Sequence, residues 1–192
     1  MKRGKLIVLS APSGTGKTTI TKKLLEKNPK WKFSVSATTR PPRDGEVEGV
    51  DYTFMSKEKF EHYVKFGDFL EWEFVHGNRY GTLTDPLYDC LDTGYIMLLD
   101  IDVIGGKNVM EEFPDDTLSI FIEPPGLNIA EQKIVLEDRL RTRGNDQTTQ
   151  IKNRLKRFEK EMESKEFFDL HYTNENLEET LNLINKDINE RL

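Results

Sequence analysis

The chain has 192 residues, of which 36% are hydrophobic and 32% charged, proportions typical of one folded domain with a hydrophobic core. Its formal net charge of −6 argues against a general nucleic-acid-binding protein, because such proteins present a basic surface. No apolar run reaches the roughly 20 residues that span a bilayer, no cleavable signal peptide is recognisable, and Cys90 is the only cysteine, so we expect a cytoplasmic protein without an internal disulfide.

A phosphate-binding loop is predicted at the first junction of strand and helix. An apolar run over residues 6–10 leads into Ala-Pro-Ser-Gly-Thr-Gly-Lys-Thr at 11–18, and a helix is expected from Thr18 to Lys27. Backbone amides of such a loop converge on an oligophosphate, Lys17 reaches the β- and γ-phosphates, and Thr18 can bind Mg²⁺. Ala11 replaces the usual first glycine, which costs little if its φ is negative. The residues expected to bind a nucleoside triphosphate here are Ala11, Pro12, Ser13, Gly14, Thr15, Gly16, Lys17, Thr18 and Thr19.

Strands and helices alternate through most of the remaining chain, which predicts a parallel sheet flanked by helices. Further strands are expected over residues 31–35, 95–99, 118–122 and 167–172. Helices are expected over residues 107–113, 131–143 and 177–191, and a long charged helix should begin after possible caps at 146–149 and reach about residue 166.

Residues 36–92 interrupt this alternation with a Pro- and Gly-rich stretch and two aromatic segments. Ser56 is a good N-cap for a helix that runs through Lys65. Asp85-Pro86 predicts the start of another helix, and Gly94 its end. We therefore expect a small mixed α/β lobe inserted into the parent fold.

The arginines gather in two regions, 40–79 and 139–157, which suggests clamps for phosphorylated ligands in an otherwise acidic protein. Arg40 and Arg43, with two prolines between them, can present two guanidinium groups to one phosphate, and Tyr52 can add a hydroxyl donor.

With the phosphate-binding loop ahead of them, these motifs resemble the guanylate kinase family over essentially the whole sequence. The resemblance implies a P-loop kinase fold with a core of residues 1–35, 93–128 and 168–192, a GMP-binding lobe of residues 36–92 and a helical lid of residues 129–167. It implies direct in-line transfer of a phosphoryl group from ATP to GMP, with Mg²⁺ bound with ATP. We expect a monomer or small homo-oligomer without nucleic-acid or membrane partners.

The resemblance also assigns an acceptor site. Guanine presents two adjacent N–H groups, and the Glu71 carboxylate can accept a hydrogen bond from each. Adenine lacks this pair of donors and would leave the carboxylate charge unpaired. Ser36 and Thr82 would lie beside the base, and Arg40, Arg43, Tyr52 and Tyr80 would hold the phosphate. The full implied GMP site is Ser36, Arg40, Arg43, Glu46, Tyr52, Glu71, Tyr80, Gly81, Thr82, Asp100 and Asp102.

The lid arginines are the last part of the resemblance. Arg139 and Arg143 share one helical face at a spacing of four, and Arg154 follows on the next helix. Asn174 matches a residue near the adenine, and Arg141 and Arg157 are predicted to face solvent. The implied catalytic residues are Lys17, Arg40, Arg139, Arg143 and Arg154.

Three alternative functions fit these residues less well. A P-loop kinase for another phosphorylated acceptor, such as a ribose bisphosphate, has no need of Ser36, Glu71 and Thr82. A non-catalytic guanylate-kinase-like binding module typically lacks the loop lysine or the acceptor arginines, which this chain has. A nucleic-acid end kinase would need a basic groove, against which the acidic composition argues.

Overall fold

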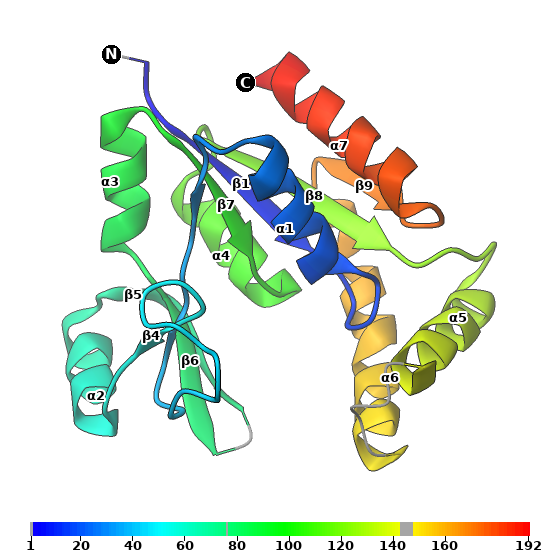
Figure 1. Ribbon diagram of the computed structural model, residues 1–192, viewed down its shortest axis with the longest axis horizontal. Coiled ribbons are helices and arrows are strands. Elements are labelled where there is room, and N and C mark those ends of the chain that lie inside the picture. Colours follow the sequence, from blue (N-terminus) through cyan, green and yellow to red (C-terminus); the bar gives the residue numbers. More distant parts are fainter. Residues whose placement is uncertain (1, 76, 143–147) are drawn as a thin grey trace.

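The computed structural model describes residues 2–75, 77–142 and 148–192, and its larger sheet has five parallel strands in the order β2-β7-β1-β8-β9 (Figure 1). The central strand is β1, and β2 and β9 form the edges. The bounds are β1 Lys5–Ser10, β2 Lys32–Phe33, β7 Ile96–Asp100, β8 Thr117–Glu123 and β9 Leu170–Thr173. The expected α/β class with a parallel core sheet is confirmed.

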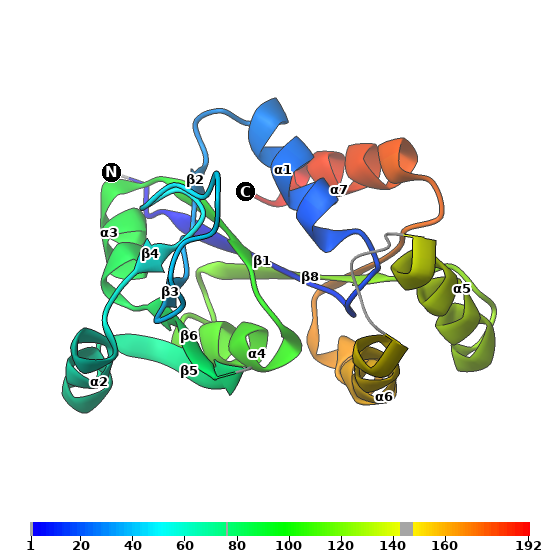
Figure 2. The ribbon, with the colours of Figure 1, turned by 60° about the horizontal axis from the view of Figure 1, so that its bottom comes forward.

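Helices cover both faces of this sheet because β1 alternates its side chains between two buried clusters (Figure 2). Leu6 and Val8 belong to a cluster with α3 and α4, while Ile7 and Leu9 belong to a cluster with α1 and α7. These helices are α1 Lys17–Lys27, α3 Asp85–Thr93, α4 Val103–Glu112 and α7 Leu177–Arg191.

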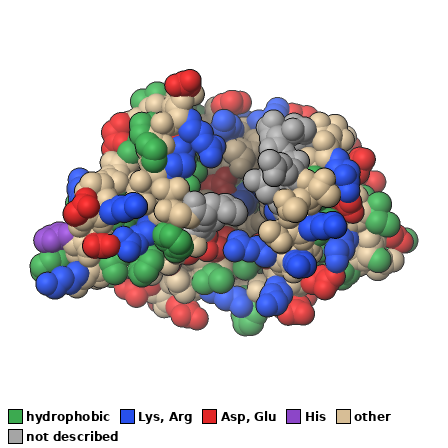
Figure 3. All heavy atoms as spheres, turned by 90° about the horizontal axis from the view of Figure 1, so that it is seen from below, with side chains coloured by type: hydrophobic (Ala, Val, Ile, Leu, Met, Phe, Trp, Pro, Cys, Tyr) green, Lys and Arg blue, Asp and Glu red, His purple; other side chains and the backbone are tan. Residues whose placement is uncertain are grey.

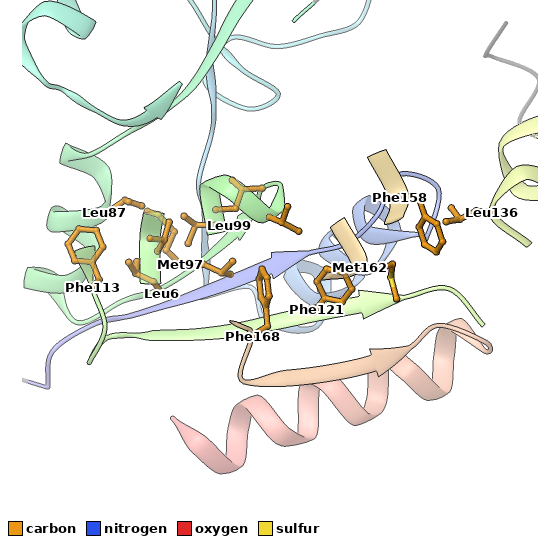
Figure 4. Close-up of a cluster of buried hydrophobic side chains, with 14 of the residues drawn as sticks. Leu6, Leu87, Met97, Leu99, Phe113, Phe121, Leu136, Phe158, Met162 and Phe168 are labelled. Carbon is orange, nitrogen blue, oxygen red and sulfur yellow. The ribbon is translucent and has the colours of Figure 1, made fainter. Parts of the chain in front are cut away.

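The first cluster continues along the sheet into two further helices, α5 (Ile129–Thr142) and α6 (Thr148–Glu163). Figure 4 shows this cluster, from Leu6 on β1 to Leu136 on α5 and Phe158 on α6. Leu136 and Phe158 are each 1% exposed. The α5–α6 pair therefore shares the buried core of the parallel sheet.

A smaller mixed sheet lies beside the first, in the order β4-β3-β6-β5, with α2 (Lys57–Phe66) packed on it (Figure 1). Phe60 of α2 stacks on Phe69 of β5 with the ring centroids 4.3 Å apart. β6 pairs antiparallel with both β3 and β5, and β3 pairs parallel with β4. The strands are β3 Ala37–Thr38, β4 Thr53–Phe54, β5 Phe69–Val75 and β6 Asn78–Leu83.

Two helix bounds differ from the expected ones for clear reasons. α4 begins at Val103 rather than at Lys107, because the Asp102 carboxylate caps it and accepts hydrogen bonds from the amides of Ile104 and Gly105 at 3.0 and 2.8 Å. α6 ends at Glu163 rather than near residue 166, because a 3-10 turn follows and carries Phe168 into the core at 4% exposure. The last strand consequently starts at Leu170, while the predicted helix end at Arg143 and the predicted caps at 146 and 147 lie outside the described residues.

Among the described residues, no helix is both long and apolar enough to cross a bilayer.

Replacing Ser56 with alanine should lower the free energy of unfolding by about 1 kcal/mol. The Ser56 hydroxyl accepts a hydrogen bond from the Lys59 amide at 3.2 Å at the start of α2. Thr84→Ala is the matched control, because Thr84 precedes α3 but its side chain makes no capping hydrogen bond. Denaturant unfolding of both variants measures the difference, and equal losses would show that the Ser56 cap contributes nothing.

Candidate active site

The loop between β1 and α1 is held in place at the carboxyl edge of the parallel sheet. The Thr15 hydroxyl donates to the Pro12 carbonyl at 2.7 Å, and the Asn174 amide donates to the Thr15 carbonyl at 2.7 Å. Gly14 and Gly16 have φ values of 96° and 104°, and an added Cβ would come within 2.8 Å of Leu136 or 2.7 Å of Asn174. Only glycine fits these two positions without strain.

Lys17 opens α1 and contacts the neighbouring strand. Its ammonium donates to the Asp100 carboxylate and, at 3.1 Å, to the Ile101 carbonyl. Asp100 also accepts a hydrogen bond from the Thr21 hydroxyl at 3.2 Å. A phosphate that enters the loop would therefore compete with Asp100 for Lys17.

A pocket opens beside Asp100, between the two sheets, on the side of the molecule that Figure 3 shows as hollowed, with acidic side chains at the floor and Lys and Arg side chains around it. It collects most of the predicted acceptor residues and adds Glu73 and Ile101. Its lining residues are Ser36, Tyr52, Glu71, Glu73, Tyr80, Gly81, Asp100, Ile101 and Asp102.

The Glu71 carboxylate is half-buried in this pocket. It accepts a hydrogen bond from the Thr82 hydroxyl at 2.6 Å, across the β5–β6 ladder in which the two residues face each other. Burial raises the pKa of Glu71, and the Asp102 and Glu73 carboxylates raise it further, while the hydrogen bond from Thr82 opposes them. Among the described residues, the Thr82 hydroxyl is the one side chain that donates a hydrogen bond to the Glu71 carboxylate, so the carboxylate can accept further hydrogen bonds from a ligand.

Arg40 is fixed by Glu46, which the sequence had placed among the ligand-binding residues. The two guanidinium nitrogens donate to the two Glu46 oxygens at 2.9 and 2.8 Å, and the same carboxylate accepts from the Arg43 amide at 2.7 Å. The Arg40 guanidinium also lies over the Tyr52 ring, 5.2 Å from its centroid. Glu46 thus holds the Arg40 guanidinium and the Arg43 backbone, and the exposed Arg43 guanidinium makes no ion pair with any residue in the described part of the chain.

The α5–α6 pair contacts the phosphate-binding loop through two of the predicted lid arginines. Arg139 donates to the carbonyls of Thr15 and Asn174 at 3.4 and 3.0 Å, and Arg154 donates to the Ser13 hydroxyl at 2.6 Å. Arg143 lies outside the described residues. A second pocket follows the loop on this side and is lined by Gly14, Thr15, Gly16, Thr19, Asp138, Arg139, Thr142, Asn174, Glu175 and Leu177.

Sequence reasoning missed two carboxylates at the site. Glu73 follows Glu71 by two residues and so shares its face of β5, a period that could have identified it. Glu161 of α6 lies near the Ser13 amide, and burial raises its pKa. Arg157 is exposed as predicted, yet its charge partly opposes the rise in the pKa of both Glu73 and Glu161, so it lies near them.

Comparisons with known proteins agree with this arrangement. The family model described as guanylate kinase matches residues 3–191. Guanylate kinases from Chlorobium luteolum and a Synechocystis species are 44% and 41% identical, over 94% and 98% of this chain and 89% and 95% of their own lengths. The crystal structure of guanylate kinase from Anaplasma phagocytophilum superposes with a TM-score of 0.74 at 34% identity, over 100% of this chain and 87% of that one. The chain therefore belongs to the guanylate kinase family.

Proposed function

We propose that this member of the guanylate kinase family phosphorylates GMP with ATP by direct in-line transfer, giving GDP and ADP. The observation that carries the proposal is the position of Asp100, which pairs with Lys17 of the phosphate-binding loop and also lines the acceptor pocket. The two sites meet at this residue, so two nucleotides bound in them would bring their phosphates together.

The donor is held by the loop amides and Lys17. Two φ-positive glycines shape the loop, and the N-terminus of α1 adds a favourable dipole for an anion. When phosphate replaces Asp100 as the partner of Lys17, the ammonium can neutralise charge at the transferring group. We assign the binding of ATP to Ala11–Thr19, with Asn174 beside the adenine.

The acceptor is held at two ends. Arg40, oriented by Glu46, would bind the GMP phosphate together with Arg43, Tyr52 and Tyr80. At the other end Glu71 would accept hydrogen bonds from the two guanine N–H groups. Since the Thr82 hydroxyl already donates to Glu71, the half-buried Ser36, whose hydroxyl has no partner among the described residues, is the better donor to guanine O6.

The acceptor phosphate is already an anionic nucleophile, so the protein needs no covalent intermediate. Catalysis then consists of positioning two repelling anions and neutralising the charge that develops between them. Arg139 and Arg154, which contact the loop, would supply part of this positive charge, and we assign the same role to Arg143.

The residues around the loop fit the Mg²⁺ that usually accompanies ATP. Thr18 is exposed at the start of α1, and Thr18 and Asp100 line one pocket, which offers the oxygen ligands that Mg²⁺ prefers. No group of three or more His, Cys, Asp or Glu that could hold a metal occurs in the described ranges, so phosphate oxygens would have to complete the coordination. When bound, Mg²⁺ would neutralise charge on the donor phosphates.

We further propose the division into a core (residues 1–35, 93–128 and 168–192), a GMP-binding lobe (36–92) and a lid (129–167). Two observations support this division. All strands of the smaller sheet lie within residues 36–92, and α5 and α6 both lie within residues 129–167. A monomer or small homo-oligomer in the cytoplasm fits the same proposal.

The proposed activity is tested by ADP release from ATP with GMP, AMP, CMP or UMP as acceptor. GMP should be preferred over AMP by about 10⁴-fold in kcat/KM, because AMP leaves the buried hydrogen-bonding groups unpaired. Removal of Mg²⁺ by a chelator should abolish turnover. Similar rates with all four acceptors would contradict the assignment of the base-reading residues.

The pH dependence of kcat/KM for GMP should reveal Glu71. Its raised pKa means that the carboxyl takes up a proton at a higher pH than an ordinary glutamate, so guanine recognition is lost from that pH downward. The GMP phosphate titrates as well, with a pKa of about 6, but this step is common to wild type and Glu71→Gln. The wild-type profile should therefore show one more loss of kcat/KM toward acid pH than the Glu71→Gln profile. Superimposable profiles would contradict a role for the ionised carboxylate.

A further inference from the structure

One carboxylate in the acceptor pocket has no role in the mechanism above. Glu73 lies on β5 opposite Tyr80, two rungs along the ladder from the Glu71–Thr82 pair and on the same face of the strand. Its side chain lines the pocket and forms no hydrogen bond or ion pair within the described ranges. Partial burial raises the pKa of Glu73, and the neighbouring Asp102 carboxylate raises it further.

A guanidinium faces it from the α5–α6 pair. Arg157 lies three residues after Arg154 and four before Glu161, so the three side chains share one face of α6. Arg154 donates to the Ser13 hydroxyl of the phosphate-binding loop at 2.6 Å, and Glu161 lies near the Ser13 amide, so this face of α6 is directed toward the cleft. In the part of the chain that the structure describes, Arg157 has no hydrogen bond or ion pair, although its charge acts on Glu73 and Glu161.

These two side chains belong to different parts of the molecule. Glu73 is carried by the smaller sheet, which holds most of the proposed acceptor residues, and Arg157 by α6, which contacts the phosphate-binding loop (Figure 1). Neither has a partner of opposite charge at contact distance among the residues that the structure describes, and each faces the cleft between those parts. A small movement of the two parts toward each other would bring the charges together without any change in either element.

We propose that Glu73 and Arg157 form an ion pair across the cleft when both nucleotides are bound, and that this pair couples the α5–α6 pair to the acceptor lobe. The inference rests on the proposed function, because the acceptor and donor must occupy the two sides of the same cleft. Glu73 and Arg157 are positioning residues: they touch neither nucleotide and act by holding the closed arrangement. Water leaves the cleft as it closes, which strengthens the attraction between the two charges.

The test is a double-mutant cycle with Glu73→Gln, Arg157→Gln and the double variant, together with the charge exchange Glu73→Arg with Arg157→Glu. Each single variant should raise the KM of both substrates by about 3- to 10-fold, the double variant should be no worse than one single variant, and the exchanged pair should recover most of the loss. Lys156→Gln, at an exposed neighbouring position on α6, is the control and should match wild type. Thermal unfolding of every variant excludes loss of fold as the cause.

Binding measurements separate this proposal from its rivals. Calorimetry with a non-hydrolysable ATP analogue should show tighter binding in the presence of GMP for wild type, and this enhancement should disappear in each single variant while binding of GMP alone is unchanged. Loss of GMP binding in Glu73→Gln alone would mean that Glu73 touches the nucleotide and would overturn the proposal. Additive effects, no rescue by the exchanged pair, or single variants equal to wild type would overturn it too. A wild-type enzyme inactive on GMP would instead contradict the proposed function.

Discussion

Lys17→Met should lower turnover by about 10³-fold or more while GMP binding stays close to wild type. In the proposed mechanism the ammonium is the cation that the loop presents to the donor phosphates, and methionine keeps much of its length without the charge. Steady-state ADP release measures the loss, and calorimetry measures GMP binding. Lys23→Met, on the same helix but in an exposed ion pair with Glu178, is the matched control and should retain activity.

Lys17→Met has a structural consequence that must be separated from the catalytic one. Asp100 would lose its ion pair and keep only the hydrogen bond from Thr21. An unpaired, largely buried carboxylate lowers stability, so unfolding should be followed alongside activity. A folded variant with wild-type turnover would remove the loop lysine from the mechanism.

Glu71→Gln should lower kcat/KM for GMP by about 10²- to 10³-fold with little effect on the KM of ATP. Glutamine offers one acceptor where guanine presents two donors, and its own N–H₂ group would face a guanine donor. The preference for GMP over AMP should fall with it, which competition between the two acceptors measures directly. Glu61→Gln is the control, because Glu61 forms an exposed ion pair with Arg79 on the outside of the same lobe.

The same substitution should raise the thermal midpoint of the free protein. The ionised Glu71 carboxylate lowers the stability of the folded protein, since burial and two neighbouring carboxylates raise its pKa. A group with a raised pKa in the folded state destabilises that state above this pKa, and the neutral amide removes the penalty. The gain should therefore be present at neutral pH and vanish as the pH falls below the ordinary range of a glutamate. A preference for GMP that survives the substitution would contradict the base-reading role.

The parts of the fold with a strong local signal could be predicted from the sequence. The loop at 11–18, the capped helix after Ser56 and the closing helix Leu177–Arg191 all carry short-range patterns. The two-residue strands β3 and β4 do not, because two residues show no period and their pairing depends on β6. The Gly105-Gly106 pair concealed the first turn of α4, which the Asp102 cap stabilises against its low helix propensity.

The candidate site divides in the same way. Residue types that bind phosphate or guanine could be named from their order along the chain, but their contacts with one another could not. The pairing of Lys17 with Asp100 joins the start of α1 to the end of β7, and the pairing of Arg40 with Glu46 gives a supporting contact to a residue expected to touch the ligand. Such contacts depend on the tertiary structure, which local sequence patterns do not determine.

The most direct measurement is a crystal structure of the protein with GMP, Mg²⁺ and a non-hydrolysable ATP analogue. A GMP phosphate oxygen should lie about 3 to 3.5 Å from the γ-phosphorus and in line with its leaving oxygen. Lys17 should have left Asp100 for the donor phosphates, and Arg40 and Arg43 should hold the acceptor phosphate. A GMP molecule bound away from Glu71, or with its phosphate directed away from the loop, would contradict the claim that separate cationic groups hold the two nucleotides end to end.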